Sequence, residues 1–187
     1  MSEYSDDERK QLLRLAHYAI AAELQRSPLD TTHPSEHLAE PRGAFTTLHR
    51  DGKLRGCIGY VIPIHPLYRT IAETAAAAAF RDPRFRPVTL VELPKLQIEI
   101  SVLSPMTAIA PEDVEVGKHG LLVTYGSNRG LLLPQVAVEW NWDRETFLCE
   151  TCRKAGLPPA AWQQGATLEA FTAEVFGETE PGESLRE

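Results

Sequence analysis

The segment GAFTTLHRDGKLRGCIGYV, residues 43–61, decides the fold, because it holds two strand-like runs joined by the pair Asp51-Gly52. An Asp-Gly pair between two such runs is among the strongest short signals for a tight β-hairpin. A two-residue turn also fixes the register of the hairpin, since the residues that flank the turn face each other. Counting outward from the turn, the sequence predicts that Cys57 lies opposite Thr46.

The predicted hairpin has two faces of different chemistry, because successive side chains of a strand point to opposite sides. One face carries most of the large apolar side chains and is the predicted core face; it comprises Phe45, Leu54, Ile58 and Tyr60 with Thr47 and His49. The other face carries an arginine and a thiol; it comprises Leu48, Arg55, Cys57 and Val61 with Ala44 and Thr46. We therefore expect Arg55 and Cys57 to emerge together on the side away from the core.

The rest of the chain predicts helices interspersed with antiparallel strands. Ser5 and Glu8 form a capping box in front of a helical repeat of apolar residues. The pattern predicts helices over 5–26, 66–80, 134–140 and 143–155, strands over 96–103, 121–125, 131–133 and 169–176, and a long loop over 27–43. The pattern of residues 169–176 fits a helix nearly as well as a strand. The mixture implies an α+β fold built on antiparallel sheet.

The composition indicates a folded protein whose net charge lies at its ends. The chain has 187 residues, of which 43% are hydrophobic, and a formal net charge of −7. Residues 1–8 contribute −4 and residues 177–187 contribute −3, so these acidic ends leave a formally neutral body. A formally neutral body creates no general positive potential that would attract phosphate groups, which disfavours nucleic acid as a partner. Without an apolar run of roughly 20 residues or a basic, apolar leader, we expect no membrane association and a cytoplasmic location.

Six motifs, in order along the chain, resemble those of the AMMECR-domain family. They are LRGCIG, AAFRDPRFRPVTLVEL, IEISVLSP, VGKHGLLV, LLLPQVAVEW and FLCETCRKAGL. The match covers about residues 12–176, so residues 1–187 resemble a single AMMECR-type domain. The resemblance implies an α+β fold in which a larger and a smaller subdomain pack intimately around antiparallel sheet. It also implies association with a Memo-like protein and a radical SAM protein, as component A of the AmmeMemoRadiSam system. It implies neither a reaction nor a cofactor.

Cys57 is the first candidate for chemistry. A free thiol has a pKa of about 8.5, and a positive charge at Arg55, two residues away, favours the thiolate by roughly 2 kcal/mol at an effective dielectric near 20. Burial in an apolar site opposes this effect. Gly56 and Gly59 let another group approach the strand closely. That group is either a ligand bound beside Arg55 or a helix packed tightly on the sheet, and both interpretations are open.

Other polar residues extend the candidate site. His119 is the favoured base for Cys57, and Glu99 is either an acid–base group or a solvated side chain. Gln135 and Glu139 lie four residues apart on a predicted helix and are expected to line the same cleft. The turn RDPRFRP offers an anion clamp or a structural ion pair through Arg81, Asp82 and Arg84.

The sequence predicts no metal site. Cys149 and Cys152 form a C-x-x-C pair, but no second pair of ligands follows at the spacing that zinc requires. Two hypotheses remain. The first is an accessory or interaction component that uses a cleft around Arg55 and Cys57. The second is a cysteine-dependent enzyme that acts on a small anionic substrate with Cys57 as the nucleophile.

Overall fold

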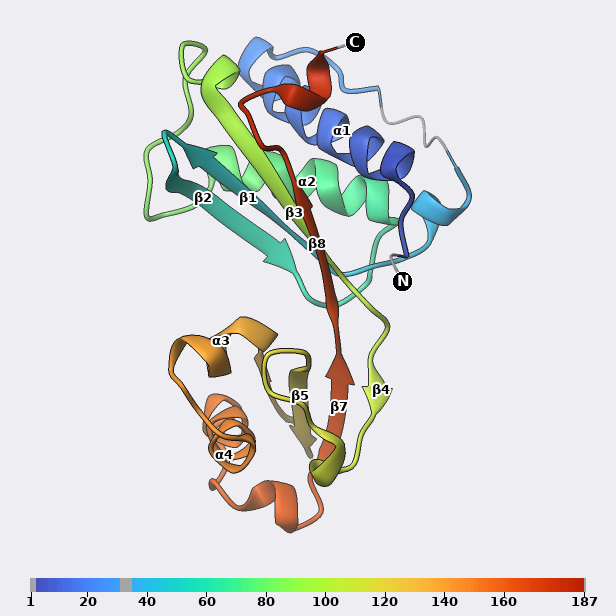
Figure 1. Ribbon diagram of the computed structural model, residues 1–187, viewed down its shortest axis with the longest axis vertical. Coiled ribbons are helices and arrows are strands. Elements are labelled where there is room, and N and C mark those ends of the chain that lie inside the picture. The colour runs from blue at the N-terminus through green and yellow to red at the C-terminus, as the bar shows by residue number, and fades with distance from the viewer. Residues whose placement is uncertain (1–2, 31–34, 187) are drawn as a thin grey trace. The chain divides into compact units, whose positions relative to one another are not determined.

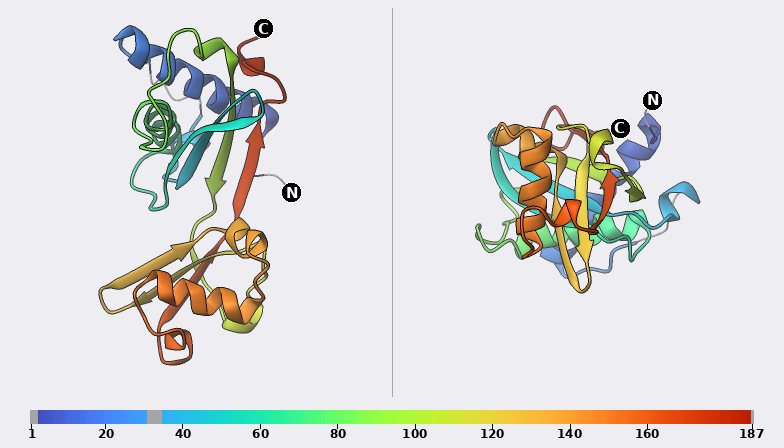
Figure 2. Two further views of the ribbon diagram at one scale, coloured as in Figure 1. Left: turned by 90° about the vertical axis from the view of Figure 1, so that its left-hand side faces the viewer. Right: turned by 90° about the horizontal axis from the view of Figure 1, so that it is seen from below.

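The computed structural model describes residues 3–30 and 35–186, which form two compact units (Figures 1 and 2). The first unit comprises the residues up to Leu103 and those from Glu174 onward, and the second unit comprises Ser104–Ala173. Each unit has one four-stranded sheet and its own hydrophobic core. The predicted α+β fold is confirmed. Residues 31–34 of the predicted loop lie outside the described residues.

The first unit is a sheet with two helices on one of its faces. Its strands are β1 (Ala44–Arg50), β2 (Lys53–Tyr60), β3 (Leu96–Leu103) and β8 (Ala173–Gly177), in the order β2-β1-β3-β8. Helices α1 (Asp6–Gln25) and α2 (Leu67–Phe80) lie behind the sheet in Figure 1 and bury their apolar side chains in the core between helices and sheet. The predicted capping box of Ser5 and Glu8 begins α1.

The core face that the sequence predicts for the β1–β2 hairpin is wrong for β1 but right for Ile58 and Tyr60 on β2, which lie opposite Thr46 and Ala44. On β1 the buried residues are Ala44, Thr46 and Leu48, which lie on the other face. Helix α2 presents a run of alanines to this face of β1 and packs very close to it, which buries Ala44, Thr46 and Leu48. The hydroxyl groups of Thr46 and Thr74 complete this contact with a hydrogen bond of 2.8 Å across the core.

The predicted register of the hairpin is also wrong beyond the first two pairs. Strand β2 contains one extra residue, Arg55, and the pairing shifts between Leu48 and His49. Cys57 consequently lies opposite Thr47 instead of Thr46. Because such a bulge moves the following residues by one position, the side chain of Cys57 lies on the sheet face away from the two helices.

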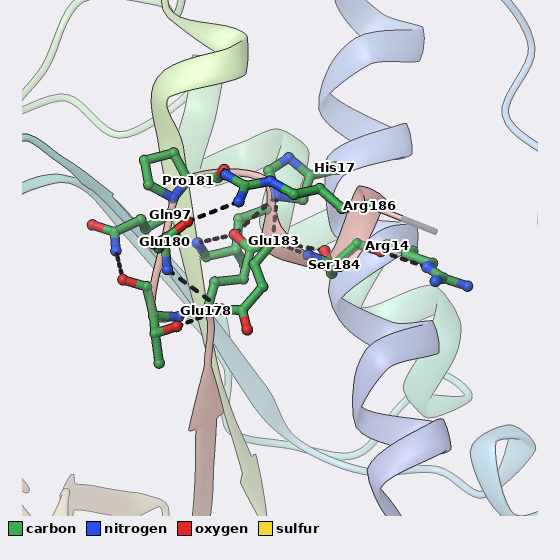
Figure 3. A network of polar contacts seen from close by, with 11 residues as sticks. Arg14, His17, Gln97, Glu178, Glu180, Pro181, Glu183, Ser184 and Arg186 are labelled. Atoms are coloured by element: carbon green, nitrogen blue, oxygen red, sulfur yellow. Dashed lines mark hydrogen bonds and ion pairs between the residues drawn. The ribbon is translucent and has the colours of Figure 1, made fainter.

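The C-terminal segment of the first unit folds back against α1 and β3 (Figure 3). Its centre is Glu178, whose side chain is 1% exposed and lies beside His17, which is 2% exposed. The Glu178 carboxylate lies 3.0 Å from Nε2 of His17 and also accepts hydrogen bonds from the backbone N–H of Ile98 and from the hydroxyl of Ser184. The acidic C-terminal end is therefore partly built into the fold.

The second unit has the sheet order β4-β7-β5-β6 with two short helices. Its elements are β4 (Thr107–Ala108), β5 (Gly120–Tyr125), β6 (Asn128–Leu132), α3 (Pro134–Glu139), α4 (Arg144–Lys154) and β7 (Thr167–Phe171). Asp143 caps α4 as the sequence predicts. The single strand predicted over 169–176 is instead two strands, β7 and β8, which belong to different sheets.

Short 3-10 turns connect several of these elements. They are His37–Ala39, Leu93–Lys95, Pro111–Asp113, Ala161–Gln163 and Glu183–Leu185. Within residues 3–30 and 35–186, none of the helices combines the length and the apolar character that crossing a membrane requires.

Candidate functional site

Cys57 lies near the middle of β2, half-exposed, on the face of the sheet away from α1 and α2. The hydroxyl of Thr47 donates a hydrogen bond of 3.3 Å to its sulfur. Thr47 in turn pairs with Glu99 on β3, so Cys57, Thr47 and Glu99 form one row across three neighbouring strands. The sequence predicts the first and last members of this row but not Thr47, because the bulge at Arg55 is what brings that residue opposite the thiol.

The backbone of Cys57 is held by the turn that follows α2. Its N–H donates to Oδ2 of Asp82 at 3.0 Å, and its carbonyl accepts from Nη2 of Arg84 at 3.3 Å. The same guanidinium donates to Asp82 at 2.7 Å, and its hydrogen bonds hold the pKa of this buried carboxyl well below its usual range. Arg81 points elsewhere, to Glu23 on α1. Asp82 and Arg84 therefore pair with each other and together hold the backbone of Cys57 at the outer edge of β2.

Arg55 is engaged by Glu92. Its Nε donates to Oε1 of Glu92 at 3.0 Å, and its Nη2 donates to the carbonyl of Arg86 at 2.9 Å. The hydrogen bond from Arg55, with further ones from Thr89 and Arg50, lowers the pKa of Glu92 to about 2. Arg55 thus braces the loop of residues 82–95 instead of forming an open anion clamp. Glu92 follows Thr89 at the T-x-x-E spacing of a capping pair, which is the signal that could have identified it from sequence.

The two glycines beside Cys57 serve packing. A Cβ atom on Gly56 would overlap the backbone carbonyl of Ala78 in α2, and one on Gly59 would overlap the ring of Phe45. Helix α2 thus approaches β2 at Gly56, and the Phe45 ring occupies the space that Gly59 leaves. Both neighbours belong to the protein itself, so the close approach predicted at these positions is made by α2 and Phe45.

Cavities in the first unit lie away from the thiol. One of about 460 Å³ lies between α1 and α2, and another of the same volume lies between α1 and the C-terminal segment. Neither Arg55 nor Cys57 lines either of them. The cleft around Arg55 and Cys57 therefore belongs to neither of these two cavities and stays a prediction.

The remaining candidate residues belong to the second unit. Nδ1 of His119 accepts a hydrogen bond of 3.0 Å from the N–H of Glu115, while Gln135 and Glu139 are exposed on α3. Cooperation of these three residues with Cys57 in one site stays a prediction.

The C-x-x-C pair also belongs to the second unit. Cys152 is part of its core, and burial raises the pKa of this thiol. Among the described residues, no group of three or more His, Cys, Asp or Glu side chains is arranged to hold a metal ion. Of the two cysteines, Cys152 packs in the core, whereas Cys149 is only partly buried.

Comparison with known proteins places these features in a family. The AMMECR1 family model matches residues 13–176. The protein PF1979 of Pyrococcus furiosus is 45% identical over 91% of this chain and 88% of its own length, and MJ0810 of Methanocaldococcus jannaschii is 47% identical over 76% of each chain. The crystal structure of the uncharacterized protein PH0010 from Pyrococcus horikoshii matches with a TM-score of 0.81 and 42% identity over 96% of both chains. The chain belongs to the AMMECR1 family.

Proposed function

We propose that this protein is an accessory component that binds other proteins through the sheet face and braced loop around Arg55 and Cys57. The partners we expect are a Memo-like protein and a radical SAM protein. The observation that carries the proposal is that the two guanidinium groups near the thiol are already paired with carboxylates. Arg55 binds Glu92, and Arg84 binds Asp82. Among the described residues, the sulfur has a single hydrogen-bond partner, the neutral hydroxyl of Thr47.

A catalytic cysteine needs a base, and an anion clamp needs free donors. In the first unit, Arg55 and Arg84 donate to Glu92 and Asp82, and so support the loop 82–95 and the edge of β2. What this region offers to the outside is a stable surface. A rigid surface with a row of polar side chains suits protein recognition, since little conformational entropy is lost when a partner binds.

The test is direct binding. The purified protein is titrated with the Memo-like protein and with the radical SAM protein of the same organism by isothermal titration calorimetry. We expect at least one of them to bind with a dissociation constant of about 1–10 µM or below, within the range of transient protein complexes. Thr47→Arg, which places a long cation in the middle of the Cys57 row, should weaken this binding about tenfold or more.

The matched control is Ser127→Arg, which adds the same side chain at an exposed turn of the second unit and should leave the affinity unchanged. Circular dichroism spectra of both variants check that they are folded. If the wild-type protein binds neither partner, the proposed function is wrong.

The cysteine-dependent enzyme remains the second candidate. It is supported by the half-exposed thiol of Cys57 and by the guanidinium of Arg84, which lies against the carbonyl of the same residue. For such an enzyme we expect iodoacetamide to label native Cys57 with a pH midpoint well below that of a free cysteine, about 8.5. Mass spectrometry of the labelled peptide measures this midpoint. An absence of labelling before denaturation would identify a packed thiol and exclude Cys57 as a nucleophile.

A further inference from the structure

The chain has a local excess of positive charge at one end of the first unit. Residues 50–55 and 82–95 together hold six Lys or Arg residues and three Asp or Glu residues, an excess of three positive charges in a chain of net charge −7. The first segment is the turn of the β1–β2 hairpin with the start of β2, and the second is the loop that runs up to β3. We call these two segments together the basic tip.

Hydrogen bonds join the two segments of the basic tip into one surface. Arg50 and Arg55, from the hairpin, both donate to Glu92 in the loop, at 2.7 Å and 3.0 Å. Glu92 also accepts from the N–H and the hydroxyl of Thr89. The loop lies beside the end of the hairpin in Figure 1, as these contacts require. The basic tip is therefore fixed in shape although most of it is irregular backbone.

The acidic groups of the basic tip are occupied within it. Glu92 and Asp82 are largely buried against arginines, and Asp51 pairs with Arg50 at 3.3 Å. Three further cations are exposed, and their side chains form no hydrogen bond or ion pair with any described residue; they are Lys53, Arg86 and Lys95. The uncompensated charge thus points to solvent, where it can attract an anionic partner.

Large aliphatic side chains of the basic tip are also exposed. Val91 is 74% exposed and Leu90 is 60% exposed, both within the turn that Thr89 and Glu92 close. Leu54, on the hairpin, is 42% exposed. Single exposed aliphatic residues are ordinary, but three of them on a fixed surface with excess positive charge form an amphipathic patch.

We propose that the basic tip is a docking surface for an acidic segment of a partner protein, in which Asp and Glu residues alternate with large apolar residues. The acidic side chains would pair with Lys53, Arg86 and Lys95, and the apolar ones would cover Leu54, Leu90 and Val91. This inference rests on the proposed function, since it names the chemistry of the partner.

Two other anionic partners fit the surface less well. Nucleic acid favours exposed aromatic side chains for stacking, whereas the aromatic ring of the basic tip, Phe85, is half-buried between the guanidinium groups of Arg55 and Arg84. An anionic membrane would meet Asp51, which is 77% exposed at the turn of the hairpin. An acidic segment of a protein can place its own charges to avoid this carboxylate.

The probes are synthetic twelve-residue peptides in which Glu and Leu alternate in blocks, with two controls in which Lys replaces Glu or Ser replaces Leu. Fluorescence anisotropy with the full-length protein measures their binding. We expect the Glu-Leu peptide to bind about tenfold more tightly than either control and to lose affinity as salt is raised. Lys53→Glu with Arg86→Glu should weaken its binding about tenfold, and Leu90→Ser with Val91→Ser should do so to a similar extent.

The matched controls are Arg129→Glu on β6 and Ile64→Ser in the loop after β2, both exposed and both outside the basic tip; each should change the affinity less than twofold. The proposal is overturned if the variants bind the Glu-Leu peptide like the wild type. It is also overturned if a 20-nucleotide RNA, or vesicles with 30% anionic lipid, bind more tightly than the peptide and respond to the same variants. Should the peptide bind while neither expected partner protein does, the docking surface stands and the proposed partners fall.

Discussion

Replacing Gly56 by valine should lower the free energy of unfolding by about 3 kcal/mol or more, because the new side chain has no space. A Cβ atom at this position would overlap the carbonyl oxygen of Ala78, which is backbone and cannot rotate away. Helix α2 would have to move off the sheet as a whole, which would separate its alanines from Thr46 and Leu48. Urea denaturation followed by circular dichroism measures the change.

Two further variants make this result specific. Gly56→Ala should already be destabilising, since the overlap begins at Cβ. Thr47→Val changes a neighbouring strand position on the opposite face of the sheet and should shift the unfolding free energy by less than about 1 kcal/mol. A Gly56→Val protein with the stability of the wild type would show that α2 is not seated closely on β2.

Replacing Glu178 by alanine should cost about 3–5 kcal/mol of stability, because it leaves several buried donors without an acceptor. The carboxylate faces the His17 ring, the Ile98 N–H and the Ser184 hydroxyl, and these groups come from α1, β3 and the C-terminal turn (Figure 3). Glu180, two residues on, is exposed and pairs with Arg186, so Glu180→Ala should cost less than about 1 kcal/mol. Thermal unfolding of the two variants should therefore differ clearly.

The same carboxylate gives the stability a pH dependence of known sign. Burial acts to raise the pKa of Glu178, but the hydrogen bonds from His17 and Ser184 outweigh it, and the pKa in the folded protein is lowered. The contribution is thus complete above the pKa of an unfolded glutamate, about 4.3, and is lost as pH falls through the lowered folded value. The stability difference between the wild type and Glu178→Gln should shrink over this range. A difference that grows on acidification would contradict the assignment.

Local signals in the sequence predict the secondary structure well. The pair Asp51-Gly52 places the hairpin, the Ser5–Glu8 box begins α1, and Asp143 begins α4, as found. The two capping signals work because their side chains bond to backbone a few positions away, and the Asp51-Gly52 pair works because both residues adopt the positive φ of a tight hairpin turn. The bulge at Arg55 has no such local signature. Its single extra residue changes the residue opposite Cys57 on β1 from the predicted Thr46 to Thr47.

The candidate site was less predictable because its contacts are distant in sequence. Arg55 could be predicted as a neighbour of Cys57, but not as a partner of Glu92, which lies 37 residues away in an irregular loop. The edge of β2 is also held by a residue distant in sequence, because Asp82, which accepts a hydrogen bond from the backbone of Cys57, lies 25 residues away. Spacing within one strand therefore predicts that Arg55 and Cys57 are neighbours but cannot predict the partners of the arginine.

The closure of the outer edge of β2 by Asp82 and Arg84 also bears on aggregation. An outermost strand with free amide and carbonyl groups is a template on which strands of other molecules can assemble. Here the carboxylate of Asp82 accepts from the amide of Cys57 and the guanidinium of Arg84 donates to its carbonyl, so Cys57 offers neither backbone group to a strand of another molecule. A change that removed Asp82 would uncover this template, and the damage would appear as aggregation even in molecules that still fold.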